Sequence, residues 1–311
     1  MELYTLLLLH KLEESFGYYD VQSGRQIASI KTRPFPHEIC LDPQRKKVYI
    51  AEMGVRGIES IGSGGHTISV FDIKTHRLVS VIDTGHYDRP HGITTYGNKL
   101  FVTSESTKNL LIYNLKTEKL INAVFLGQEC AHMVNVTADG KTAYTANIWS
   151  NSLTAIDIEN YKVLHNIPAP ERPEGMVFSS DGSLIYCVCR EAKVVAVIDR
   201  ENAKMVDKIE TGHGPVRIVI SPDGKNLCIP LFHSASVQLV DTVTRRVSKT
   251  ITVGPHPAGI CLSPDGKLVF ISCEEENIVY VLDFNTLEIL NKIKTGNGAD
   301  AMVCLFSSEV E

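Results

Sequence analysis

The chain has 311 residues, a formal net charge of -5 and a hydrophobic content of 43%. This composition is ordinary for a globular protein, and the negative charge leaves no excess of lysine and arginine for a nucleic-acid backbone. The apolar run at residues 6–9 follows Glu2 and is too short for a signal-peptide core or a membrane span. We therefore expect a soluble, cytoplasmic protein that binds neither nucleic acid nor a membrane.

Several of the eight cysteines lie inside apolar runs, where a small hydrophobic residue would otherwise stand. Because free cysteine is often buried, we expect reduced thiols rather than disulfides. The cysteines in such runs are Cys40, Cys187, Cys228, Cys261 and Cys304.

A short motif of the form Pro-x-x-Ile, with relaxed matches, recurs along the chain. Its starts are Pro36, Pro90, Ala131, Pro173, Pro215, Pro257 and Ala299, with a first interval of 54 residues and later intervals of 41 or 42. A period near 42 that contains several alternating apolar runs is typical of a four-stranded propeller blade. A helical repeat would need a period of 3.6 residues, which is absent.

The unit that starts at Pro257 shows the expected strands in order. AGICLS is the first strand, the turn SPDGK follows, and LVFISC, IVYVLD and LEILNKIKTG are the second, third and fourth strands. Related turns recur at residues 137–141, 179–183 and 221–225, and more weakly at 41–46. Glycine suits the left-handed position of such turns.

The two ends of the chain together supply one further blade. Only one strand, AMVCLF, follows Ala299, whereas YTLLLLH, FGYYD and RQIASIK precede Pro36. Joining them protects edges that a linear array would leave unpaired. We predict an all-β fold with one domain, residues 1–311: a single seven-bladed β-propeller of four-stranded antiparallel blades. Residues 1–35 plus 299–311 form its closing blade.

The second strands resemble those of a known repeat. KVYIAEM, KLFVTSE, TAYTANI and LVFISCE are similar second strands, and several of the third strands end in aspartate: Asp72, Asp157, Asp199, Asp241 and Asp283. This pattern resembles the YVTN-type β-propeller repeat family, which includes YncE-like and lactonase-like propellers. The resemblance implies the fold but does not fix an activity, because members include surface proteins, enzymes and proteins of unknown role. Related propeller lyases and lactonases make lyase chemistry or lactone and ester hydrolysis the leading reaction classes.

Strand alternation places the loops between fourth and first strands, and between second and third strands, on one face, here called the top face. Nine of the eleven histidines map there. One position, directly after the first residue of each motif, should border the top mouth of the central channel. We call these residues the inner ring: His37, His91, His132, Glu174, Val216, Ala258 and Asp300.

The inner ring supports two interpretations. His37, His91, His132 and Glu174 form a plausible ligand set for a divalent transition metal such as zinc, iron or copper, although no local spacing motif supports one. Alternatively, the mouth is a hydrogen-bonded pore or a ligand site without a metal. For catalysis there, the candidate residues are His132, Glu174, Arg217 and Asp300.

Further candidates surround the inner ring. The second strands end in His10, Glu52, Ser104 and Asn147, and Glu105, Arg190 and Glu274 lie nearby. We expect these residues to orient the imidazoles or to contact a ligand. Among the top loops, His233 is a further candidate contact, and Trp149 is either a pocket wall or a packing lid. Arg33, Arg89 and Arg172 either bind an anion or are solvated loop charges.

The glycine-rich insertion at residues 54–66 lengthens the first blade, and it is either a lid over the mouth or a passive surface loop. The sequence contains no phosphate loop, dinucleotide fingerprint or serine-nucleophile elbow. We expect a small-molecule ligand at the top face. The alternative is a non-enzymatic scaffold for a protein partner, which would favour a broad apolar patch there.

Overall fold

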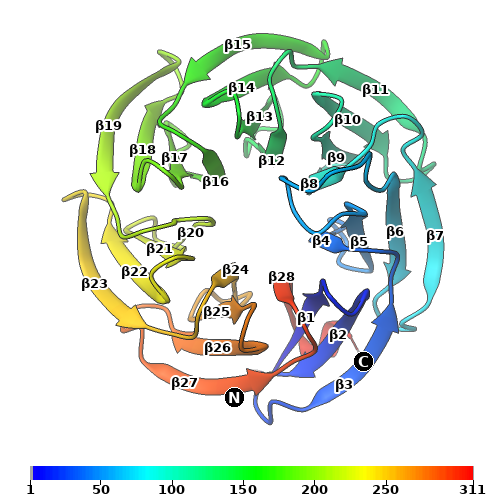
Figure 1. Ribbon diagram of the computed structural model, residues 1–311, viewed down its shortest axis with the longest axis vertical. Coiled ribbons are helices and arrows are strands. Elements are labelled where there is room, and N and C mark those ends of the chain that lie inside the picture. Colours follow the sequence, from blue (N-terminus) through cyan, green and yellow to red (C-terminus); the bar gives the residue numbers. More distant parts are fainter. Residues whose placement is uncertain (1–2, 311) are drawn as a thin grey trace.

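The computed structural model describes residues 3–310, which form a ring of seven four-stranded antiparallel sheets (Figure 1). Blade 1 contains β4 (Pro36–Leu41), β5 (Lys47–Glu52), β6 (Thr67–Asp72) and β7 (Leu78–Asp83), and blade 2 contains β8 (Pro90–Tyr96), β9 (Lys99–Ser104), β10 (Asn109–Asn114) and β11 (Leu120–Phe125). Blade 3 contains β12 (Ala131–Val136), β13 (Thr142–Asn147), β14 (Ser152–Asp157) and β15 (Lys162–Pro168), and blade 4 contains β16 (Pro173–Phe178), β17 (Leu184–Cys189), β18 (Val194–Asp199) and β19 (Lys204–Glu210). Blade 5 contains β20 (Val219–Ile220), β21 (Asn226–Leu231), β22 (Ser236–Asp241) and β23 (Arg246–Thr252), and blade 6 contains β24 (Pro257–Leu262), β25 (Leu268–Cys273), β26 (Ile278–Asp283) and β27 (Ile289–Lys294).

The closing blade joins the two ends of the chain, as the sequence predicts. It contains β28 (Ala299–Phe306), β1 (Tyr4–His10), β2 (Ser15–Asp20) and β3 (Gln26–Lys31), in that order from the centre outward (Figure 1). β28 pairs antiparallel with β1, from Tyr4 opposite Phe306 to His10 opposite Ala299. A 3-10 turn, η1 (Ser307–Glu309), follows β28. Residues 1–2 and 311, which the sequence assigns to this blade, lie outside the described residues.

The core lies between the blades. Second and third strands of each blade are almost wholly buried, because neighbouring blades cover both faces, whereas the fourth strands are largely exposed. Within residues 3–310 there are seven apolar clusters, one at each contact between adjacent blades. Strands that are buried on both faces favour continuous runs of apolar residues, and Leu6–Leu9 in β1 is such a run.

The most regular motif residues build turns. In the turn after β20, Asp223 accepts hydrogen bonds from Ser221 and from the backbone of Lys225, and Gly224 has a φ of 73°. At the end of β6, Asp72 accepts the backbone N–H of Thr75 at 2.8 Å. These hydrogen bonds lower the pKa of both carboxyl groups. The repeated aspartates are therefore explained by the fold rather than by a binding site.

Blade 5 departs from the expected pattern. The motif predicts an inner strand from Pro215, but β20 covers only Val219–Ile220, preceded by a single bridge between Pro215 and Leu231. A proline stands opposite the interruption. Pro230 has no N–H to donate and offers only its carbonyl, which accepts the N–H of Val216 at 3.4 Å.

All eight cysteines are free, and six of them are buried, in agreement with the expected reduced thiols. Among residues 3–310, no helix has the length and apolarity to cross a membrane.

Candidate functional site

A repeated backbone feature positions the site. In every blade the residue before the inner strand has a left-handed backbone, with φ between 51° and 76°: Phe35, Arg89, Cys130, Arg172, Gly214, His256 and Gly298. Its carbonyl accepts the N–H of the residue that follows the second strand, at 2.7 to 3.1 Å. These donors form what we call the outer ring: Lys11, Met53, Glu105, Ile148, Arg190, Phe232 and Glu274.

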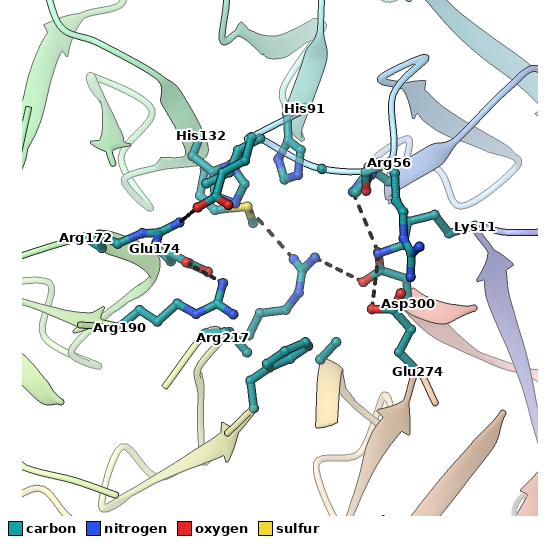
Figure 2. Close-up of a pocket in the computed structure, with 18 of the residues that line it drawn as sticks. Lys11, Arg56, His91, His132, Arg172, Glu174, Arg190, Arg217, Glu274 and Asp300 are labelled. Carbon is teal, nitrogen blue, oxygen red and sulfur yellow. Dashed lines mark hydrogen bonds and ion pairs between the residues drawn. The ribbon is translucent and has the colours of Figure 1, made fainter. Parts of the chain in front are cut away.

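The two rings meet in a cavity of about 500 Å³ at the top mouth (Figure 2). All seven inner-ring residues line it, and so do Lys11, Arg190, Phe232 and Glu274 of the outer ring. His233 lines it too, as does residue range 56–59 of the insertion. The sequence-predicted inner ring is therefore brought together as one wall of a single cavity.

Four predicted ligand contacts are buried and do not line the cavity: His10, Glu52, Asn147 and Glu105. His10 bonds Tyr19 at 2.8 Å, Glu52 accepts hydrogen bonds from Thr67 and Ser69, and Asn147 donates to Ser152 and Thr154. Successive side chains of a strand alternate in direction, so in the closing blade the next residue, Lys11, reaches the mouth instead, whereas Met53 and Ile148 are buried and do not line it. If the candidates at the ends of the second strands had been taken one residue later, Lys11 would have been identified as well.

Trp149 also lies outside the cavity. Its side chain is 46% exposed, and the Arg172 guanidinium lies 4.7 Å from its ring centroid. Trp149 therefore supports an arginine that lines the cavity, rather than forming the pocket wall itself. Arg33 lies outside the cavity too; its backbone N–H bonds Glu52.

His132 and Glu105 form a close buried pair. His132 Nδ1 lies 2.6 Å from Glu105 Oε1. Burial alone would lower the pKa of His132, but the hydrogen bond and charge of Glu105 outweigh burial and leave the pKa above its ordinary value. The ring of His91 stacks on that of His132, with centroids 3.8 Å apart.

The backbone of blade 2 explains this stacking. A Cβ at Gly92 would lie 2.3 Å from the carbonyl oxygen of His132, so only glycine allows the inner strands to approach this closely. Burial, and the neighbouring rings of His132 and His37, lower the pKa of His91 well below its ordinary value. His91 is therefore a neutral imidazole beside the His132–Glu105 pair.

The four predicted metal ligands do not converge. His37 Nε2 donates to the carbonyl oxygen of Arg56 at 3.1 Å, its Nδ1 lies 3.7 Å from Asp300, and Glu174 pairs with Arg190 at 3.3 Å. His37 and Glu174 are thus engaged with other groups. Instead, His91, Glu105 and His132 offer donor atoms that all lie within 4.8 Å of one another. Sequence reasoning gave Glu105 a supporting role because it lies outside the inner ring.

Arg217 extends into the centre of the ring and lines the cavity (Figure 2). Its guanidinium pairs with Glu38 of blade 1 and lies 3.5 Å from Asp300 of the closing blade. Lys11 lies 3.1 Å from Asp300 and 3.3 Å from Glu274. Burial would raise the pKa of Asp300, but Lys11 and Arg217 hold it at about 2.

Asp300 is therefore ionised at neutral pH and holds Arg217 and Lys11 in place, and its catalytic role stays a prediction. Glu38 was missed by sequence reasoning, because it lies one residue deeper than the inner ring. The available signal was the position of Glu38 in the sequence: it directly follows His37, and the rest of the strand as far as Leu41 is apolar.

The insertion lies over the mouth and is held there. Arg89 donates to the carbonyl oxygens of Ile58, Ser60 and Gly62, at 3.2, 2.5 and 2.6 Å. From the opposite side of the mouth, Arg172 lies 3.4 Å from Glu59. Arg89 and Arg172 thus fasten the insertion to blades 2 and 4.

Solved structures share this architecture at low sequence identity. The periplasmic gluconolactonase PpgL of Pseudomonas aeruginosa is 18% identical with a TM-score of 0.79, covering 97% of this chain and 99% of that one. A putative 6-phosphogluconolactonase from Bacteroides uniformis is 17% identical with a TM-score of 0.80, covering 98% and 100%. Hydrazine synthase from Kuenenia stuttgartiensis is 16% identical with a TM-score of 0.73, covering 88% and 93%. At these identities the likeness shows the fold alone.

Sequence comparisons agree with the repeat type. Antigen Lp49 of Leptospira interrogans is 27% identical over 130 residues, which make up 40% of this chain and only 28% of that relative's length. Residues 112–222 match the YNCE-like beta-propeller family model. This middle part of the chain is therefore similar to YNCE-like β-propellers, in agreement with the resemblance seen in the repeats.

Proposed function

We propose that the top cavity binds a small polar lactone and hydrolyses it. The observation that carries this proposal is the buried His132–Glu105 pair, whose histidine lines a cavity of about 500 Å³ that Arg217 also lines. Fold similarity to a gluconolactonase and to a putative 6-phosphogluconolactonase supports the reaction class.

The proposed chemistry follows from which atoms are already bonded. His132 Nδ1 is bonded to Glu105, so Nε2 is the ring nitrogen that can accept a proton from an attacking water. The resulting hydroxide adds to the lactone carbonyl, and Arg217 donates hydrogen bonds to the developing oxyanion. Collapse of this intermediate breaks the ring C–O bond, and the proton held by His132 passes to the leaving alkoxide. The product is the open-chain hydroxy acid.

The charges of the cavity favour a hydroxyl-rich substrate over a polyanion. Arg190 pairs with Glu174, Lys11 pairs with Glu274 and Asp300, and Arg172 pairs with Glu59 and Glu191. Because carboxylates accompany these cations, the wall offers hydrogen-bond donors and acceptors in alternation. Sugar-derived lactones present hydroxyl groups that match such a wall.

Hydrolysis of δ-gluconolactone, followed with a pH indicator above the uncatalysed rate, tests the proposal. We expect His132→Gln and Glu105→Gln each to lower kcat by roughly 100-fold or more, because each removes part of the group that accepts the water proton. His86→Ala is the matched control, since His86 is exposed and does not line the cavity. Circular dichroism should show all three variants folded. Unchanged kcat/KM in both cavity variants would exclude this role for the pair.

A further inference from the structure

His91, Glu105 and His132 form a buried cluster where blades 2 and 3 meet. His91 lies on β8, Glu105 follows β9, and His132 lies on β12. The residues His91 and Glu105 are 2% and 5% exposed, and the His132 side chain is 11% exposed. The cluster thus has one side within the protein and another at the cavity, which His91 and His132 line.

Two polar atoms of this cluster are not satisfied by the protein. His91 Nδ1 and Glu105 Oε2 are buried and have no hydrogen-bond partner among the described residues. Leaving a buried polar atom unpaired is unfavourable, because the atom has lost its hydrogen bonds to water. An imidazole nitrogen and a carboxylate oxygen are both good metal donors, so one cation bound between them would satisfy both atoms.

We propose that His91, Glu105 and His132 bind one divalent transition-metal ion, with zinc the best match. Two imidazoles and one carboxylate form a three-residue ligand set that leaves a fourth position for water. Nitrogen donors favour a transition metal over magnesium or calcium. The inference uses the wall described under the proposed function, but metal binding can be measured without any lactone.

Binding would require a defined local rearrangement. The donor atoms lie within 4.8 Å of one another, and zinc binding at about 2.0–2.2 Å also requires each lone pair to point at the ion. The His91 and His132 rings are only 24° from parallel, and each nitrogen lone pair lies in its own ring plane. One ring must therefore turn about its Cβ–Cγ bond, and His91 can do so without losing a hydrogen bond at Nδ1.

A bound metal would take over activation of the attacking water. His91, Glu105 and His132 would hold the ion, and the proton now shared by His132 and Glu105 would be released to solvent. A zinc-bound water loses its proton to solvent near pH 7, so the ion would supply the hydroxide in place of His132, and the leaving alkoxide would take its proton from solvent water.

The test is zinc titration of untagged, chelator-treated protein by calorimetry, with metal content measured after desalting. We expect about one zinc ion per chain, and at least a tenfold loss of affinity in His91→Ala, His91→Gln and Glu105→Gln. His233→Ala is the matched control, because His233 lines the same cavity outside the cluster, and its zinc affinity should be unchanged. Melting temperatures show whether each variant is folded, and the two substitutions at His91 guard against a folding defect in either one.

The metal site is excluded if the chelator-treated wild type takes up no zinc. It is also excluded if the variants at His91 and Glu105 bind zinc as tightly as the wild type. Metal-free protein that hydrolyses the lactone at the full rate also excludes the metal's role, and the His132–Glu105 pair then acts alone. A third outcome separates the two proposals. If the wild type binds one zinc ion, the cluster variants do not, and the wild type hydrolyses no lactone, the metal site is supported and the proposed function is overturned.

Discussion

His10, Ser15 and Tyr19 form a buried hydrogen-bonded group inside the closing blade. His10 Nδ1 lies 3.1 Å from Ser15 Oγ, and Nε2 lies 2.8 Å from the Tyr19 hydroxyl. Burial lowers the pKa of His10 to about 4, although the charge of Glu13 opposes this shift. His10 therefore stays neutral in the fold over a pH range in which an exposed histidine is protonated.

This shift predicts acid sensitivity. In the unfolded chain His10 takes up its proton near pH 6.5, whereas in the folded chain it does so only near pH 4, so protonation favours unfolding as the pH falls. Protonation of His10 should therefore lower the free energy of unfolding by about 2 kcal/mol between pH 7.5 and pH 5. Urea denaturation at both pH values should show a smaller loss in His10→Gln than in the wild type.

His86→Gln is the control for this measurement, because His86 is exposed, and it should lose as much stability as the wild type. Equal losses in the wild type and His10→Gln would show that His10 does not contribute to the acid sensitivity.

At the level of elements, the insertion at residues 54–66 distinguishes blade 1 from the other blades. Its two ends are in contact: Gly65 donates its N–H to Met53 at 2.6 Å, and a Cβ on Gly54 would lie 2.1 Å from Gly65 N. With a φ of 71°, Gly54 also occupies backbone space that other residues rarely adopt. The insertion therefore leaves and re-enters the blade at nearly one point, and it covers the cavity without altering the sheet.

Deleting residues 55–64 tests whether the insertion contributes to ligand binding without contributing to the stability of the propeller. Because the loop ends already touch, we expect the unfolding free energy to change by no more than about 1 kcal/mol. The KM for the lactone should rise severalfold, since Arg56 and Glu59 line the cavity. Thermal unfolding and initial-rate kinetics measure the two effects. An unchanged KM would make the insertion a passive surface loop.

Over the whole molecule, ring closure depends on one strand. β28 pairs with β1 along its length, and its side chains pack in the clusters shared with blade 6 and blade 1. It also carries Asp300, which holds Arg217 and Lys11. The last strand of the chain therefore completes both the fold and the cavity.

Removing residues 299–311 should destabilise the protein by far more than its length suggests, because β1 gains an unpaired edge and two apolar clusters open. We expect a melting temperature lower by ten degrees or more, with self-association. A synthetic peptide of residues 299–311 should restore part of the loss by pairing with β1. A truncated chain that stays monomeric and melts within two degrees of the full-length protein would contradict this account of closure.

The sequence by itself determined the blade number, the strand order and the closing blade, because a 42-residue period and alternating apolar runs are local signals. It also determined the inner ring, since one motif position recurs in every blade. Only the tertiary structure decided which ring neighbours meet. The close approach at Gly92 stacks His91 on His132, and Glu105 joins them because alternation turns it, rather than Ser104, toward His132. Arg217 likewise reaches Glu38 and Asp300 only across the closed ring, so no local pattern could pair residues so distant in sequence.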